Sequence, residues 1–193
     1  MRKITAVENI TLDGVMQAPG RPDEDERGGF TRGGWGAAYG DEVMARAMAG
    51  RMSEGGEMLF GRRTYQDFYS VWPNRTDNPF TEVLNNRHKY VASTTLSEPL
   101  PWQNSTLLKG DAADTVAELK RQPGPNLAVL GSGQLVQSLR RHRLIDEYVL
   151  LIYPTVFGTG SRLFPDGAAA EDLRLVDSVT TTKGVIIATY VTV

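Results

Sequence analysis

The stretch Asn126–Pro154, NLAVLGSGQLVQSLRRHRLIDEYVLLIYP, indicates the fold class of this 193-residue chain. Four apolar residues, Leu127–Leu130, predict a buried strand that ends at the glycine-rich turn 131–133. Helix-forming residues begin near Gln134, and the apolar run EYVLLIY predicts a second strand after the helix. A strand, a tight turn, a helix and another strand in this order are typical of an α/β sheet.

The same alternation continues on both sides of this stretch. Lys3–Ile10 predicts a strand, and Asp41–Arg51 predicts a helix with Val43, Ala47 and Met48 on one face. Further segments predict, in order, a strand, a helix, two strands and a helix: EMLFG (57–61), RRTYQDFYSVW (62–72), KYVAST (89–94), STLLKG (105–110) and DAADTVAELKRQ (111–122). Asp111 is the expected N-cap of the last helix.

The C-terminal segment predicts a β-hairpin, with its turn at Lys183-Gly184 and Val185, Ile187, Thr189 and Val191 on one face. We therefore expect a single domain over residues 1–193. Its fold would be a mixed, mostly parallel α/β sheet with helices on both faces and an antiparallel edge. The polar loop Thr11–Gly34 is too long for a plain connection, and loops of that length are usually functional or mobile.

Composition narrows the functional classes. The net charge of −2 argues against a dedicated nucleic-acid binder, which usually carries a basic patch. The chain has no cysteine, so disulfides, zinc–thiolate sites and thiol nucleophiles are excluded. No apolar run reaches the ~18–20 residues that span a bilayer, and the N-terminus has no signal-peptide core. We expect a cytoplasmic protein with no membrane or nucleic-acid partner.

Three predicted strands end in residues suited to a ligand: Gly61, Ser93-Thr94 and Gly131-Ser132-Gly133. Ligands of open α/β sheets lie beyond the carboxyl ends of the strands. Glycine allows close approach of backbone N–H groups to a phosphate, and the following helix N-terminus carries partial positive charge. A plain strand-to-helix turn and simple strand-end caps are the alternative explanations.

Arg62, Arg63 and Thr64 open a helix directly after Gly61. Positive side chains at a helix N-terminus oppose the helix dipole by a few tenths of a kcal/mol unless an anion offsets them. The pattern therefore indicates an anion site, or else two arginines that are simply solvated.

Taken together, these segments resemble the cofactor-binding segments of the dihydrofolate reductase fold. GRRTY (61–65), GSGQL (131–135) and YPTVFGTG (153–160), with TLDGVMQAPG (11–20), are more similar to the reductase domain of the riboflavin-biosynthesis deaminase-reductase. The resemblance covers nearly the whole chain and is nearest to stand-alone bacterial members. It implies a three-layer αβα architecture around a mixed sheet of about eight strands.

The resemblance also implies NADPH as the cofactor. The residues it assigns to the cofactor lie in the three strand-end segments: Gly61, Arg62, Arg63, Thr64, Ser93, Thr94, Gly131, Ser132, Gly133, Gln134 and Leu135. Arg62 or Arg63 is the candidate for the 2′-phosphate, because arginine suits this extra negative charge better than an acidic residue.

On the substrate side, Asp13 and Asp41 are the candidate catalytic acids, and Trp35 and Tyr153 are the candidate substrate contacts. Each has a simpler explanation: a turn for Asp13, a helix start for Asp41, and core packing for the two aromatics. The two histidines lack metal-ligand spacing, so no metal site is expected.

The resemblance implies hydride transfer from NADPH to a C=N or C=O bond of a small heterocyclic or sugar-linked substrate, with the long loop as a lid. It is similar to the reduction catalysed by 5-amino-6-(5-phosphoribosylamino)uracil reductase, a pyrimidine reductase. The alternatives are a non-catalytic NADP(H)-binding protein and a true dihydrofolate reductase. A homodimer is expected, because the apolar strand VIIATYV would otherwise be an exposed edge.

Overall fold

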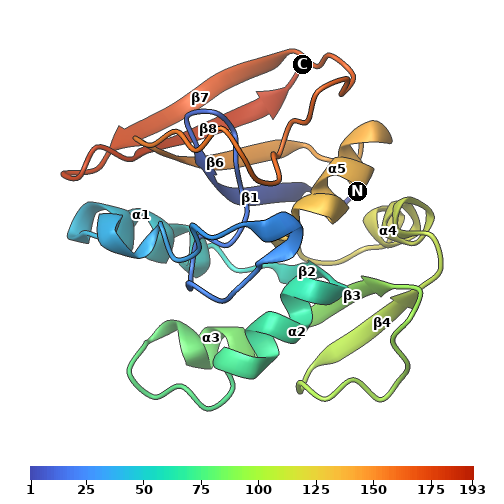
Figure 1. Cartoon of the computed structure of the whole chain (residues 1–193). Helices are drawn as coiled ribbons and strands as arrows, with labels where there is room; N and C mark the ends of the chain where they lie inside the picture. Colours follow the sequence, from blue (N-terminus) through green and yellow to red (C-terminus); the bar gives the residue numbers. More distant parts are fainter. The chain divides into compact units, whose positions relative to one another are not determined.

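The computed structural model describes all 193 residues and contains an eight-stranded mixed sheet in the order β4-β3-β2-β5-β1-β6-β8-β7 (Figure 1). The chain divides into two compact units. The first comprises Met1–Ala6 and Glu54–Ile145, and the second comprises Val7–Ser53 and Asp146–Val193. Strand β1 (Ile4–Thr11) contributes residues to both. The predicted fold class is confirmed, whereas the single domain stays a prediction.

Four strands of the first unit are parallel: β2 (Glu57–Gly61), β3 (Lys89–Ser93), β4 (Ser105–Lys109) and β5 (Leu127–Leu130). Strand β2 pairs with both β3 and β5, and β3 pairs with β4. The central strands are short apolar runs, as expected where helices cover both faces of a parallel sheet. All four were predicted to within one residue.

The helices of this unit are α2 (Arg62–Val71), α3 (Phe80–Asn86), α4 (Ala112–Arg121) and α5 (Gly133–Arg141). Helix α2 contacts β2 and β3, while α4 and α5 contact each other. The crossovers β2–β3 and β4–β5 run in opposite directions across the sheet, so right-handed connections place α2 and α4 on opposite faces. Helix α3 was not predicted.

The second unit contains helix α1 (Glu42–Ser53) and strands β6 (Glu147–Tyr153), β7 (Leu173–Thr180) and β8 (Ile186–Thr192). Both strand pairs, β6–β8 and β7–β8, are antiparallel. One face of β6 and β8 forms a buried cluster that α1 covers, lined by Val149, Leu151, Tyr153, Val185 and Ile187. Met44, Ala47 and Met48 of α1 pack on it, so Met44 takes the place predicted for Val43.

The C-terminal hairpin forms as predicted, with a turn in which Gly184 has φ +82°. Val185, Ile187 and Thr189 are buried, whereas Val191 is only half-buried. The expectation for the sheet edge was wrong, because β8 lies between β6 and β7. The edge strand is β7, most of whose residues are exposed. A β-bulge between Leu175 and Asp177 interrupts it, a common way to disfavour strand addition.

The long loop after β1 has a small core of its own. Val15, Ala18 and Phe30 are buried together, against partly buried Trp35 and Phe157. Short 3-10 helices at Arg27–Gly29 and Ala37–Tyr39 complete the segment. The polar composition of the loop suggested that it lies wholly outside the core, but these buried residues show that it does not. None of the helices in this structure combines the length and apolarity that a membrane crossing requires.

Glu8 is a buried carboxyl group in β1. Only 3% of the residue is exposed, and its Oε1 has no hydrogen-bond partner. Burial disfavours the charged form and raises the pKa of Glu8 from 4.5 to about 8. Because the folded-state pKa lies above the unfolded value, the neutral acid stabilises the fold at low pH. That contribution is complete below pH 4.5 and is lost as the pH rises through 8.

We predict that the free energy of unfolding of the wild type falls on the order of 3–5 kcal/mol between pH 5 and 8, since one pKa unit corresponds to ~1.4 kcal/mol. This fall should be absent in the variant Glu8→Gln, because glutamine has no carboxyl group to ionise. Urea denaturation of the wild type and the variant across this range measures the difference. Glu54→Gln, at an exposed position, is the control and should follow the wild type. Parallel profiles for wild type and Glu8→Gln would contradict the prediction.

Candidate functional site

Three parallel strands of the first unit, β5, β2 and β3, end at one edge of the sheet. Gly61, the last residue of β2, is in register with Ala92 of β3, and β2 also pairs in parallel with β5. Because the strands run in the same direction, Gly61, Ser93 and Gly131 lie at the same edge. The structure thus brings together the three segments that the sequence assigned to a cofactor.

The turn between β5 and α5 has a left-handed backbone at two consecutive residues. Gly131 has φ +55° and Ser132 has φ +62°. For a residue with a side chain this conformation costs about 1–2 kcal/mol. The Ser132 Oγ accepts a hydrogen bond from the Gly61 N–H at 3.0 Å. Ser132 therefore connects the end of β2 to the start of α5.

Helices α2 and α5 both begin at this edge without a side-chain cap. Ser132 occupies the N-cap position of α5 but makes no capping bond, and the N-cap of α2 is Gly61. In α4, by contrast, the Asp111 side chain accepts hydrogen bonds from the N–H groups of Ala113 and Asp114, as predicted. The first-turn N–H groups of α2, and those of Gly133 and Gln134 in α5, therefore remain available to an anion. The Leu135 N–H already donates to the Ser132 carbonyl at 2.7 Å.

The first turn of α2 is positively charged. It contains Arg62 and Arg63 and no acidic residue. Arg62 donates to the Gln66 Oε1 at 3.0 Å, and Arg63 donates to the Gln134 Oε1 of α5 at 3.2 Å. Neither guanidinium forms an ion pair, so their charge at a helix N-terminus is not neutralised within the chain.

Some of the remaining predicted cofactor residues are exposed at the site, and others are buried beneath it. The Thr64 side chain lies beside Gly131, where an added Cβ would approach the Thr64 Cγ2 to 3.5 Å. Leu135 is buried and lies behind Gly61. The Ser93 Oγ accepts hydrogen bonds from the two backbone N–H groups that follow, at residues 95 and 96, whereas Thr94 is exposed. Ser93 and Leu135 thus shape the site from within the protein.

Asp13, in the second unit, holds the turn that follows β6. It accepts hydrogen bonds from the Phe157 N–H at 3.2 Å, the Gly158 N–H at 2.7 Å and the Thr11 Oγ1 at 2.5 Å. Desolvation alone would raise the pKa of Asp13, but these hydrogen bonds outweigh it and the pKa is lowered. Asp13 is therefore deprotonated near neutral pH and has no proton to donate.

Asp41 joins the start of α1 to the turn of the C-terminal hairpin. Its Oδ1 accepts from the Met44 N–H at 2.8 Å, and its Oδ2 accepts from the Thr182 N–H and Oγ1 at 2.7 and 2.6 Å. The Met44 N–H, then the Thr182 hydroxyl, lower the pKa of Asp41 to about 2. This is the helix-start role that the sequence left open, and it does not favour proton donation.

The two candidate substrate contacts lie together in the second unit. The rings of Trp35 and Tyr153 meet edge to face with centroids 4.9 Å apart, and Tyr39 meets Tyr153 at 5.4 Å. Tyr153 is buried, its hydroxyl donates to the Asn9 Oδ1 at 2.9 Å, and burial raises its pKa to about 12. Trp35 is more exposed and is the better candidate to contact a ligand.

Gln17 organises the long loop and was not singled out from the sequence. Its amide donates to the backbone oxygens of Asp25 and Arg27, and its Oε1 accepts from the Ser161 N–H at 2.9 Å. The Trp35 indole donates to the Gln17 carbonyl at 2.8 Å. Its position in VMQAPG, between apolar residues, was the available signal. The structure contains no group of three or more acidic, histidine or cysteine side chains able to hold a metal ion.

Comparison with known families and proteins gives one family. The sequence model of the RibD C-terminal domain matches residues 2–187. The chain is 29% identical to the uncharacterized protein YyaP of Bacillus subtilis (strain 168) over 139 residues, which are 69% of this chain and 72% of YyaP. It is 28% identical to YwjB of the same strain over 124 residues, 60% of this chain and 71% of YwjB.

Several solved structures share the fold, among them two from bacteria. A protein from Shewanella sp. PV-4 assigned to riboflavin biosynthesis has a TM-score of 0.74 and 22% identity, covering 99% of both chains. A pyrimidine reductase-like protein from Corynebacterium diphtheriae has a TM-score of 0.64 and 12% identity, covering 100% of this chain and 92% of its own. At these identities the likeness supports the fold alone.

We predict that Ser132→Ala destabilises the protein more than Ser132→Gly. Both variants lose the hydrogen bond from the Gly61 N–H, at about 1 kcal/mol, but only glycine relieves the left-handed backbone, by about 1–2 kcal/mol. Urea denaturation of the two variants measures the difference. Ser70→Ala, on the exposed face of α2, serves as a control and should change little. Equal losses for Ala and Gly would show that the backbone at residue 132 is not strained.

Proposed function

Because the chain belongs to the RibD C-terminal domain family, we propose that it is an NADPH-dependent reductase. Its substrate would be a small heterocyclic or sugar-linked compound with a reducible C=N or C=O bond. The pyrimidine reductase-like structural relative is in keeping with this class, although it supports the fold alone. The observation that carries the proposal is the pair of helix N-termini at the ends of β2 and β5.

These N-termini fit the phosphates of a dinucleotide. Gly61 has no side chain to obstruct them, and Gly131 leaves only van der Waals space beside Thr64. The first-turn N–H groups of α2 and the N–H groups of Gly133 and Gln134 would donate to the pyrophosphate, with the helix dipoles adding favourable charge. The hydrogen bond from the Gly61 N–H to the Ser132 Oγ would keep the N-termini of α2 and α5 at a constant separation.

The arginines would select NADPH over NADH. Arg62 and Arg63 have no carboxylate partner, and the β3 end offers Ser93 and Thr94 without an acidic residue. A bidentate arginine suits a phosphate monoester, whereas an acidic residue at this place would suit a free 2′-hydroxyl. Arg63, the more exposed of the two, is our first choice for the 2′-phosphate.

The bound dinucleotide would supply the hydride. The chain would supply phosphate binding, orientation and a pocket that excludes water. Asp13 and Asp41 were candidate proton donors, but each carboxylate is engaged by backbone N–H groups and has a lowered pKa. We therefore propose that the proton reaches the product from water and that Asp13 and Asp41 are positioning residues.

Two other functions remain as alternatives from the sequence: a non-catalytic NADP(H)-binding protein and a true dihydrofolate reductase. Measurable turnover would distinguish a reductase from a non-catalytic NADP(H)-binding protein. Inhibition by methotrexate would distinguish a true dihydrofolate reductase from a riboflavin-type reductase. We also propose a cytoplasmic location and a homodimer. The exposed apolar side chains of β7, Leu175 and Val176, support association of two copies, which light scattering would test.

We predict that NADPH raises the melting temperature by about 5–11 °C at ~100-fold over its dissociation constant, which corresponds to ~2.7 kcal/mol. NADH should give a smaller rise at the same concentration. Arg63→Ala should weaken NADPH binding by ~10–100-fold, the value of a charge-assisted hydrogen bond, and leave NADH binding nearly unchanged. Thermal-shift and calorimetric titrations measure these effects.

Arg121→Ala, an exposed arginine in the last turn of α4, is the matched control and should bind NADPH as the wild type does. If neither dinucleotide binds, the reductase proposal fails. If Arg63→Ala lowers both affinities equally, Arg63 contacts the shared pyrophosphate instead of the 2′-phosphate.

We further predict that the purified protein oxidises NADPH with a pyrimidine substrate of the 5-amino-6-(5-phosphoribosylamino)uracil type or with a related carbonyl compound. Asp13→Asn should retain measurable turnover, because its role is to hold the turn at 157–158, and should mainly lower the melting temperature. Absorbance at 340 nm follows the reaction. Binding of NADPH without turnover across the panel would favour the non-catalytic alternative, and complete loss of turnover in a folded Asp13→Asn would make Asp13 catalytic.

A further inference from the structure

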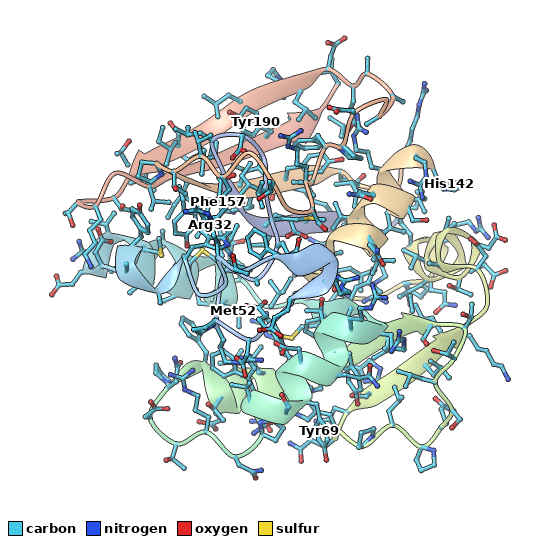
Figure 2. All side chains as sticks on the ribbon, in the orientation of Figure 1. Arg32, Met52, Tyr69, His142, Phe157 and Tyr190 are labelled. Atoms are coloured by element: carbon cyan, nitrogen blue, oxygen red, sulfur yellow. The ribbon has the colours of Figure 1, made fainter.

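A cavity of about 460 Å³, open to solvent, lies in the first unit at the C-terminal end of α2. Tyr69, labelled in Figure 2, stands on this last turn of α2, whose first turn carries Arg62 and Arg63. The lining residues come from α2, the segment after it, α3 and the segment before β4: Tyr69, Ser70, Pro73, Asn74, Asn85, Pro101, Trp102 and Gln103. None of them belongs to the strand-end site, so the cavity is separate from the proposed dinucleotide site.

Trp102 supports one wall of the cavity as a buried residue. Its backbone N–H donates to the Tyr65 hydroxyl at 3.0 Å, and its indole Nε1 donates to the Asn85 Oδ1 at 2.7 Å. The Lys89 Nζ lies 4.6 Å from the centre of the indole ring. Trp102 is 2% exposed, so these contacts hold it in one orientation.

The supports of this wall are themselves hydrogen-bonded. The Lys89 ammonium is buried and donates to the carbonyls of Leu84, Asn85 and Arg87, at 2.8, 3.3 and 2.7 Å. The Asn85 amide donates to the Pro73 carbonyl at 3.3 Å. All donors of Lys89 are thus satisfied, so the cavity has a preorganised wall before any ligand arrives.

Other polar groups of the lining are free. The Tyr69 hydroxyl and the Asn74 amide make no hydrogen bond within the protein, and Tyr69 is 39% exposed. Gln103 donates from its Nε2 to the Asn85 carbonyl at 3.1 Å, which leaves its Oε1 as an acceptor. The cavity therefore offers both donors and acceptors beside aromatic and proline surfaces.

The lining contains no charged side chain. A charged ligand would gain no ion pair from this lining, so an uncharged ligand is favoured. Amide side chains match adjacent hydroxyl groups, and the exposed ring of Tyr69 can pack against the C–H face of a sugar, since Trp102 is buried. We propose that this cavity binds an uncharged sugar ring, either free or as the sugar of a nucleoside.

The probes are D-ribose, D-glucose, D-galactose and uridine, with D-gluconate as the charged comparison. Saturation-transfer NMR and tryptophan fluorescence on the full chain should show saturable binding of at least one neutral probe at millimolar or lower concentration. Asn74→Ala and Gln103→Ala should each weaken this binding at least ~10-fold, whereas Gln122→Ala, an exposed amide outside the cavity, should not change it. Binding of uridine alone would identify the nucleoside as the source, and binding of a free sugar would identify the sugar itself.

Failure of all four neutral probes to bind would overturn the proposal. So would equal binding of D-gluconate, or binding that Asn74→Ala and Gln103→Ala leave unchanged. Displacement of the sugar by NADPH would place it at the strand-end site and would also overturn the proposal. Dinucleotide binding in the same protein is measured separately, so the two proposals can fail independently.

Discussion

The hydrogen bond from the Gly61 N–H to the Ser132 Oγ is the contact on which the strand-end site depends. It ties the last residue of β2 to the first turn of α5, and it uses the one side chain that would otherwise cap α5. The left-handed backbone at Ser132 is the conformational cost of this arrangement. Two helices consequently begin side by side with free N–H groups, which is an unfavourable arrangement unless water or an anion occupies it.

The carboxylates Asp13 and Asp41 of the second unit hold turns in place by hydrogen bonds. Asp13 and Asp41 both accept several backbone N–H groups, one set from the turn after β6 and the other from the hairpin turn. Each therefore holds segments that are far apart in sequence, 13 with 158 and 41 with 182. The same hydrogen bonds lower their pKa values, which removes them as acids near neutral pH while making them good anchors. Glu8 is the opposite case, buried without a compensating donor.

Much of the fold could be predicted because its signals are local. The apolar runs of β2 and β5 and the Asp111 cap of α4 are complete within a few residues of sequence. Helix α3 was missed because it is seven residues long, too short for a clear periodicity, and because its last carbonyls are bound by the ammonium of Lys89, which follows the helix. The loop core around Val15 and Phe30 was missed because isolated apolar residues in a polar segment reveal no partner.

By itself, the sequence determined the order and type of most elements, the glycines and arginines at the strand ends, and the absence of cysteine chemistry. These depend on residue type and short-range spacing, which a linear chain displays directly. Only the tertiary structure decided that β7 and not β8 is the sheet edge, that Ser132 bonds to Gly61, and that Asp13 and Asp41 are engaged by distant turns. Strand order, hydrogen-bond partners and burial are relations between segments separated by many residues, and burial changes both the partners and the pKa of a side chain.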